Sequence, residues 1–406
     1  MLSLKIRKAA FQCFAPVIDA GTLSRLRRCS KFQRRDLLRW LDDAGLSVYL
    51  LDRLERQGHA EDIGPWLRDE LILRKEANRL RVLGLLAEFN EMIRKVESYN
   101  VRYAVSKGFG LAPDFCSHPY LRHHSDVDLL VFRDDCESAC SAITSLGFQR
   151  SPFSSADEII FDGKGPSAGN GALRSYKLRC HSKIEIHVER EVPLAVRKRV
   201  EGLEFPVQPL SLQFSGHVLH AFRHLREGWI RPSWLVEIGY FIELHRGDAH
   251  LWEDAYAAWH PEEVQAAWLI LRMVEARVGI AMPQAFREKN VELAPGVEAW
   301  IHACSAAFLL AGCNGSRLNL LLADAMGPSV SRVNGLKVFP IHKVAHPSLV
   351  GKVQLQGFVR SIPFLFTRTI QHAVNAVGFY YHRASWRAEL ARLSMDSGNR
   401  PQRSVI

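Results

Sequence analysis

Two kinds of hydrophobic pattern divide this chain. Over residues 36–98, and again from about 210 to 325, apolar residues recur at the spacing of one helical face. Between them the spacing shortens, and apolar and polar residues alternate as they do along half-buried strands. The pattern predicts an α+β protein, in which a small mixed β-sheet core is flanked by helical regions at both ends.

The strand-like part contains several short elements. Strands are predicted at residues 101–106, 125–132, 158–161, 174–180 and 183–189, and a helix at 134–148 ends at Gly147. The glycine-rich stretch 162–173 predicts a mobile loop.

The same pattern gives an expected organisation. At 406 residues the chain is too long for one ordinary core. We expect an N-terminal helical region at 1–98, an α/β core at 99–206 and a C-terminal helical domain at 207–325. A basic extension at 326–390 and a disordered tail at 391–406 follow. The pattern of the extension defines no structure beyond a candidate hairpin near 336–346.

Composition and charge narrow the class of protein. Apolar residues make up 47% of the chain and charged residues 24%, as in folded globular proteins. The formal charge of +10 is concentrated toward the ends, with nine Lys and Arg in residues 1–35 and eight in residues 344–406. Such an excess favours a polyanionic partner, namely nucleic acid, a nucleoside triphosphate or an anionic membrane surface, and a basic surface that serves only solubility is the alternative.

Cysteine spacing and hydropathy address compartment and membrane. None of the eight cysteines forms a C-x-x-C pair, so thiols in a reducing cytoplasm are expected rather than a zinc site or a disulfide framework. No run approaches the length of apolar sequence that a membrane span needs, and residues 357–381 are interrupted by Arg360, Pro363 and Arg368. A cytoplasmic protein without a membrane span is therefore expected.

Two acidic residues lie inside the strand predicted at 125–132. Side chains alternate along a strand, so Asp126 and Asp128 share one face while Val127 and Leu129 are directed to the other. Two nearby carboxylates repel each other unless a cation lies between them, and Mg²⁺ prefers such oxygen ligands. The alternative is a hydrated strand face on which Arg122, His123 or His124 balances the acids.

Two further motifs strengthen the metal interpretation. Ser106, Lys107 and Gly108 end the preceding strand, where glycine lets backbone N–H groups approach an anion and lysine adds a positive charge. In the stretch KIEIHVE, Glu185 and His187 share one strand face. A third acid on a neighbouring strand would complete the requirements of metal-dependent phosphoryl or nucleotidyl transfer, which are shared metal ligands and a group that accepts a proton.

This order of motifs resembles the DNA polymerase β-like nucleotidyltransferase superfamily. Within it, the combination of K-G, R-x-x-x-D-x-D-L-L-V and E-x-H is similar to a bacterial nucleotidyltransferase group often called family 5, over roughly residues 75–245. The chain departs from the usual superfamily motif because Lys-Gly replaces Gly-Ser or Gly-Gly and eighteen positions separate Gly108 from Asp126.

The resemblance implies a role for each matching residue. Asp126, Asp128 and Glu185 would hold Mg²⁺ or Mn²⁺ and form the catalytic set, while Ser106, Lys107 and Gly108 would bind the triphosphate of ATP or another nucleoside triphosphate. Arg122 would contact phosphate or the acid pair, and His187 would orient Glu185 or touch substrate. The implied function is transfer of a nucleoside monophosphate to an acceptor, which could be a small metabolite, a peptide or protein, or RNA.

Two alternatives come from other classes of protein: a catalytically inactive nucleotide-binding or scaffold protein, and a nucleic-acid-binding protein without chemistry.

The other histidines and tryptophans that could carry chemistry are expected to have structural roles. His217, His220 and His224 lie near one helical face and are expected to pack or to line a cleft rather than to bind metal. Trp229 and Trp234 are expected to be core anchors, with base stacking as the alternative.

Overall fold

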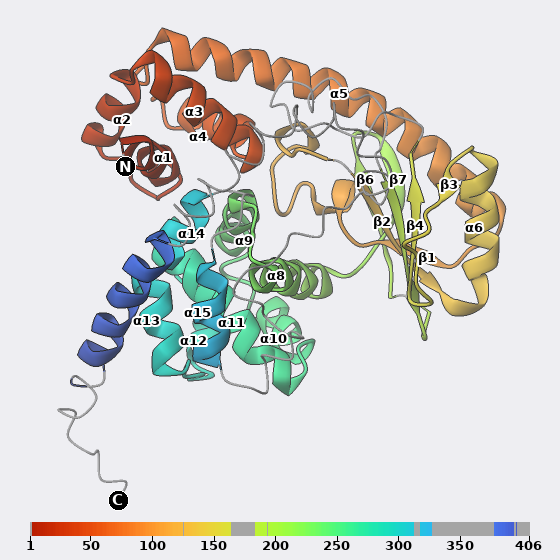
Figure 1. The fold of residues 1–406 in the computed structure, drawn as a ribbon. Helices are drawn as coiled ribbons and strands as arrows, with labels where there is room; N and C mark the ends of the chain where they lie inside the picture. Colours follow the sequence, from red (N-terminus) through yellow and green to blue (C-terminus); the bar gives the residue numbers. More distant parts are fainter. Residues whose placement is uncertain are drawn as a thin grey trace, which may run out of the picture. The chain divides into compact units, whose positions relative to one another are not determined.

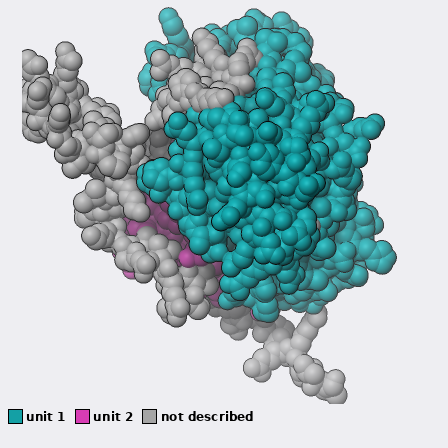
Figure 2. Space-filling view, turned by 90° about the vertical axis from the view of Figure 1, so that its right-hand side faces the viewer, with its two compact units in different colours: residues 1–222, 231–291 teal, residues 223–230, 292–406 magenta. Residues whose placement is uncertain are grey.

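A computed structural model describes residues 2–124, 126–163, 183–192, 194–311, 317–326, 377–393 and 395 of the chain. It divides into two compact units, residues 1–222 with 231–291 and residues 223–230 with 292–406, which are coloured separately in Figure 2. The strand predicted at 174–180 and the hairpin predicted near 336–346 lie outside the described residues, as do most of the glycine-rich stretch and of the tail.

The first unit begins with five helices. Their bounds are α1 (Leu2–Gln12), α2 (Ala20–Arg27), α3 (Lys31–Asp43), α4 (Ser47–Arg56) and α5 (Pro65–Ser98). Local sequence explains where several of them begin. Asp19 caps α2 by accepting from the Thr22 N–H, Ser30 and Gln33 form a capping box on α3, and Pro65 occupies the first turn of α5. Helices α3, α4 and α5 cover most of residues 36–98, where the apolar period predicts helices, and α1 and α2 precede that stretch.

Seven strands of the described residues form one mixed sheet. They are β1 (Tyr103–Val105), β2 (Asp126–Phe132), β3 (Gln149–Arg150), β4 (Glu158–Asp162), β5 (Lys183–Glu189), β6 (Val196–Val200) and β7 (Leu203–Val207), in the order β3-β4-β5-β2-β1-β7-β6. The central strand β2 runs antiparallel to β1 and parallel to β5 (Figure 1). The chain is therefore a mixed helix-and-sheet protein.

The hairpin of β6 and β7 has no counterpart in the hydrophobic pattern. Its two-residue loop, Glu201-Gly202, has φ angles of 48° and 80°. Positive φ at both positions is typical of a tight hairpin turn, and glycine adopts it without steric cost. Strand β6 reads VRKRV and is largely exposed, so it lacks the alternation that predicts a strand.

One face of the sheet is packed and the other carries polar groups. Val127 and Leu129 of β2 and Ile184 and Ile186 of β5 are buried. Helix α6 (Cys136–Ser145) packs against β2 and α5, and α5 extends from the N-terminal helices to the sheet (Figure 1). The ring of Phe89 on α5 lies 4.9 Å from that of Phe205 on β7, so this helix is anchored on the sheet.

The remaining helices of the first unit follow the sheet or lie in its connections. They are η1 (Gly108–Leu111), η2 (Pro119–Leu121), η3 (Arg133–Asp135), α8 (Leu210–Glu227), α9 (Pro232–Leu244), α10 (Ala249–Ala257), α11 (Pro261–Val278) and α12 (Gln284–Arg287). Helices α9 and α11 pack against each other, and an aromatic cluster containing Phe214, Trp252 and Phe286 joins α8, α10 and α12.

The second unit is helical in its described part. It contains the last residues of α8, then α13 (Pro295–Ala303), α14 (Ser305–Ala311), α15 (Leu318–Met326) and helical residues 377–393. Two tryptophans join its helices: Trp300 Nε1 donates to the Leu318 carbonyl at 2.7 Å, and Trp386 Nε1 donates to the Gly296 carbonyl at 2.9 Å. Among the residues described in either unit, no helix is long and apolar enough to cross a membrane.

Candidate active site

The chain leaves β1 through Ser106, Lys107 and Gly108. The Ser106 N–H donates to the Asp128 carbonyl at 3.1 Å and continues the ladder between β1 and β2 by one residue. Gly108 has φ of 60° and starts the single turn η1. This left-handed conformation favours glycine, and it turns the chain away beside Asp126. Lys107 is thereby placed next to the aspartates of β2.

The two aspartates of β2 share a face but differ in exposure. Asp128 is 3% exposed, whereas Asp126, at the start of the strand, is partly exposed. Between and beyond them, Val127 and Leu129 enter the core on the opposite face. The apolar half of the strand therefore holds the polar half in a rigid sheet.

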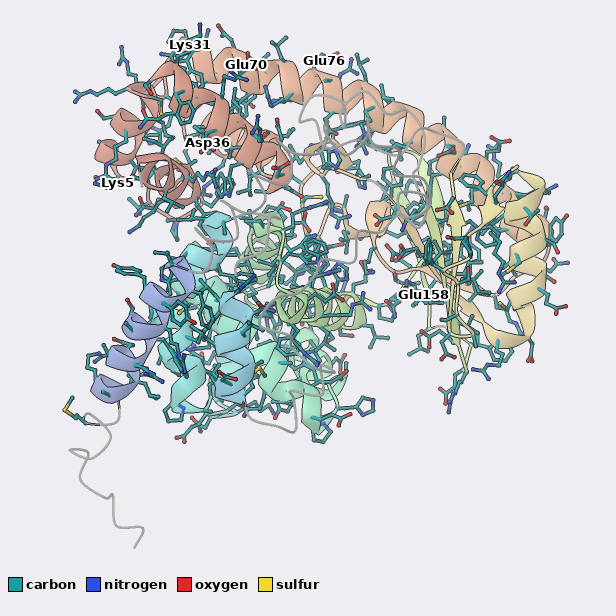
Figure 3. All side chains as sticks on the ribbon, viewed as in Figure 1. Lys5, Lys31, Asp36, Glu70, Glu76 and Glu158 are labelled. Carbon is teal, nitrogen blue, oxygen red and sulfur yellow. The ribbon has the colours of Figure 1, made fainter. Side chains whose placement is uncertain are left out.

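Strand β5 brings two more polar side chains to the same face. In the parallel register, Glu185 is the partner of Asp128, and His187 lies one pleat further on. His187 Nε2 is 3.2 Å from Asp128 Oδ1, and its Nδ1 is 3.7 Å from Glu158 Oε1 on β4 (Glu158 is labelled in Figure 3). Ligand atoms of Asp128, Glu185 and His187 all lie within 4.8 Å of one another. This spacing suits a shared metal ion.

The surroundings of this site shift the pKa values of Asp128 and Glu185 in opposite directions. Burial favours the neutral form of Asp128, but the Lys107 ammonium and the hydrogen bond with His187 outweigh it and hold the pKa of Asp128 well below its usual range. Burial, followed by the negative charges of Asp128 and Asp126, raises the pKa of Glu185. One carboxylate is thus stabilised as an anion, and its neighbour is a stronger base than an ordinary glutamate.

The structure groups the site residues somewhat differently from the sequence-based prediction. The expected ligand set was Asp126, Asp128 and Glu185, and the set within ligand distance is Asp128, Glu185 and His187. Asp126 shares the face but lies outside that group. Lys107 contacts Asp128 through Nζ at 2.8 Å.

Arg122, which precedes β2, pairs with a carboxylate outside the sheet. It is 9% exposed, and its Nε lies 3.2 Å from Oε1 of Glu237 on α9. The negative charge of Asp126 also acts on Arg122, and the contact with phosphate or with the acid pair stays a prediction. The motifs in the sequence assign no role to Glu237. Its position inside the apolar run PSWLVEIGYFI is nevertheless a signal, because a carboxylate that is buried with apolar neighbours requires a partner.

The other histidines and tryptophans pack within their own surroundings. His217 lies beside Glu237, His220 contacts the ring of Trp234 at 4.6 Å, and His224 pairs with Glu227 at 2.9 Å. None of the three histidines belongs to a candidate metal group among the residues that the structure describes. Their separate partners favour structural roles.

The two histidines before β2 differ in their surroundings. His124 is buried, its Nε2 lies 2.9 Å from the Pro119 carbonyl, and its ring packs 4.3 Å from that of Phe109. For His123, burial and the nearby Arg81 charge hold the pKa well below its usual value. Both arrangements are typical of residues that structure a loop.

The motif order and the acids on adjacent strands are typical of nucleotidyltransferases. Residues 30–277, more than half of the chain, match a family described as "Uncharacterised nucleotidyltransferase". The chain belongs to this family, and the resemblance inferred from its motifs is confirmed. No curated protein and no solved structure matches it.

Proposed function

We propose that this protein is a metal-dependent nucleotidyltransferase that moves a nucleoside monophosphate from a nucleoside triphosphate to an acceptor. The observation that carries the proposal is the convergence of Asp128, Glu185 and His187 on one sheet face, next to Lys107, in a member of a nucleotidyltransferase family.

The side chains at the site fit a divalent cation. Asp128 and Glu185 offer carboxylate oxygens, His187 offers an imidazole nitrogen, and Asp126 stands beside them on β2. Mg²⁺ and Mn²⁺ both accept such oxygen donors, and the nitrogen donor suits Mn²⁺ better. A bound cation would supply charge neutralisation for the triphosphate and for the pyrophosphate leaving group.

The chain's own residues have separate roles in the proposed reaction. Lys107 would bind a phosphate oxygen as a point charge. Glu185, the register partner of Asp128, would accept the proton of the acceptor hydroxyl. The acceptor oxygen would form a bond to the α-phosphorus, the bond from that phosphorus to the bridging oxygen would break, and pyrophosphate would leave.

The direction of Glu185 bears on the alternative of a catalytically inactive binding protein. Such a protein needs a place for the triphosphate but not a second acid that faces the aspartates. Glu185 is the register partner of Asp128 and shares ligand distance with it, as a proton acceptor beside a metal site requires. This geometry favours the enzyme.

Charge on the N-terminal helices supports an anionic acceptor. Five exposed basic residues surround the junction of α2 and α3: Arg25, Arg27, Arg28, Lys31 and Arg35. The first turn of α3 carries no acid, although helix starts favour negative charge. An RNA or an acidic protein would gain from this surface, and its binding would weaken steeply with salt.

The direct test is incubation with each of the four α-labelled nucleoside triphosphates, Mg²⁺ or Mn²⁺, and a cell extract. We expect one class of acceptor to become labelled by the wild-type protein and not by Asp128→Asn. Absence of labelling with every nucleotide and both metals, in extract from the native host, contradicts the proposal.

A further inference from the structure

A cluster of charged and polar side chains is buried in the first unit, among three helices and the segment before β2. Its members are Arg122, Glu237, His217 and Tyr49, with exposures of 9%, 1%, 1% and 6%. They come from the segment before β2, from α9, from α8 and from α4. The proposed reaction uses none of them, so their burial together needs another explanation.

The Glu237 carboxylate is the centre of this cluster. Oε1 accepts from Arg122 Nε at 3.2 Å and from the Tyr49 hydroxyl at 2.9 Å, and Oε2 lies 3.0 Å from His217 Nε2. The segment before β2, helix α4 and helix α8 therefore each contribute a side chain to the Glu237 carboxylate. Arg122 is the member that links this carboxylate to the start of β2.

The backbone around Arg122 is held as well. Asn78 Nδ2 on α5 donates to the Tyr120 carbonyl at 2.7 Å and to the Arg122 carbonyl at 3.0 Å. Arg81 Nη1 in turn donates to Asn78 Oδ1 at 3.3 Å. Side chain and main chain are thus both fixed four residues before Asp126, where β2 begins.

A buried ion pair is an inefficient way to stabilise a fold, because desolvation offsets most of the attraction and an apolar pair of similar volume does as well or better. What such a pair can provide is a definite geometry, because separating the partners would leave a buried charge uncompensated. A definite geometry is useful here, because residues that share a metal ion must be positioned to within about 0.5 Å. The carboxylates of β2 must therefore be held accurately relative to Glu185 on β5.

We propose that Glu237 is a positioning residue for this site. With Arg122 it forms a clamp that fixes the entry of β2 and so the placement of Asp126 and Asp128, and Arg122 acts through this clamp and not by binding nucleotide phosphate. The inference rests on the proposed function, since it assigns the clamp to the metal-binding acids.

A second buried pair in the same unit supplies a matched control. Arg74 on α5 reaches Asp42 on α3, with Nε 2.8 Å from Oδ1 and Nη2 3.1 Å from Oδ2, and the two side chains are 4% and 2% exposed. Asp42→Asn therefore breaks an arginine–carboxylate pair of similar burial that joins α3 to α5 and not to the segment before β2.

The test is the affinity for Mn²⁺ alone, measured by calorimetry on the full-length chain. For Glu237→Gln and for Arg122→Gln we expect a loss of about 10-fold or more, as is usual when a group that orients metal ligands is removed. For Asp42→Asn we expect less than about a twofold change. Combining Glu237→Gln with Arg122→Gln is expected to cost no more than either substitution alone, because both break one contact.

Two outcomes of this test overturn the clamp. Mn²⁺ affinity that falls equally in Asp42→Asn and Glu237→Gln overturns the clamp, since a general loss of stability would then explain both. Wild-type Mn²⁺ affinity in Arg122→Gln, with weakened nucleotide binding, also overturns it and assigns Arg122 to phosphate.

A wild-type protein that binds neither Mn²⁺ nor Mg²⁺, with or without a nucleoside triphosphate, instead refutes the proposed function. The clamp is then tested by amide hydrogen exchange of residues 126–132, the strand whose start it is proposed to fix. Faster exchange in Glu237→Gln than in Asp42→Asn supports it, and equal exchange overturns it.

Discussion

Lys107 and Asp128 form an ion pair at the centre of the candidate active site, with Nζ 2.8 Å from Oδ1. The same oxygen lies 3.2 Å from His187 Nε2. Two cationic or hydrogen-bonding groups therefore contact the oxygen that the proposed metal would use. In the proposed reaction, Lys107 would neutralise the buried carboxylate until a cation replaced it, and the released ammonium would then be available to the triphosphate.

This exchange predicts opposite effects of one substitution. In Lys107→Met, Mn²⁺ measured without nucleotide should bind more tightly, by about threefold to tenfold, because no ammonium competes for Asp128. Affinity for the nucleoside triphosphate should fall by about tenfold, because a phosphate contact is lost. Calorimetry with metal alone and with metal plus nucleotide checks both effects. If the two affinities change in the same direction, Lys107 does not alternate between Asp128 and phosphate.

The imidazole of His187 predicts a preference among metals. His187→Ala should weaken Mn²⁺ binding by about tenfold and Mg²⁺ binding by much less, because nitrogen ligands contribute more to transition metals than to Mg²⁺. Nitrogen hyperfine coupling to bound Mn²⁺, present in the wild type and absent in the variant, would identify the ligand directly. Equal losses for the two metals would show that His187 only orients its neighbours.

Glu185 and Asp128 should fail in different ways when altered. Glu185→Gln should lower the turnover rate by about 100-fold to 10,000-fold, which is the usual contribution of a general base, with a smaller change in nucleotide affinity. Asp128→Asn should remove metal binding together with activity, because it removes the buried ligand. Steady-state kinetics beside metal titrations separates these effects. Full turnover in Glu185→Gln would require a different base.

The buried carboxylate of Glu237 predicts how stability depends on pH. Burial would raise its pKa, but Arg122, His217 and Tyr49 lower it from an ordinary 4.5 to about 2. The unfolded chain therefore takes up a proton at this residue before the folded chain does, and the stabilisation is lost as pH falls from 4.5 toward 2. Burial also lowers the pKa of His217, so loss of stability begins below its ordinary value of 6.5.

Urea unfolding of the wild type and of Glu237→Gln measures this contribution. The wild type should be more stable by about 3 kcal/mol at pH 7, and the difference should shrink as pH falls below 4.5. A difference that stays constant down to pH 3 would mean that Glu237 is not ionised in its buried pair.

Much of the site follows from local sequence. Asp126, Asp128, Glu185 and His187 lie on strands whose alternation assigns each side chain to a face, and Lys107-Gly108 marks the end of β1. These features depend only on neighbours along the chain. The parallel register that places Glu185 opposite Asp128 depends on the whole sheet, so the sequence predicts the acids but not which of them share a metal.

Other features could not be read from the pattern for similar reasons. The β6 strand lacks alternation because it lies at the sheet edge, where both faces of the strand are largely exposed. Arg122 and Glu237 are 115 positions apart, and no period relates them. The one local signal of a partner is an acid inside the apolar run PSWLVEIGYFI.

The central claim is that the face formed by β2 and β5 transfers a nucleoside monophosphate. The most direct measurement follows the label of α-labelled and γ-labelled nucleoside triphosphate in parallel, with Mn²⁺ and the labelled acceptor fraction, in wild type and Asp128→Asn. We predict that the α-label enters the acceptor, that the γ-label leaves as pyrophosphate, and that Asp128→Asn does neither. Transfer of the γ-label, or α-label transfer that persists in Asp128→Asn, would contradict the account.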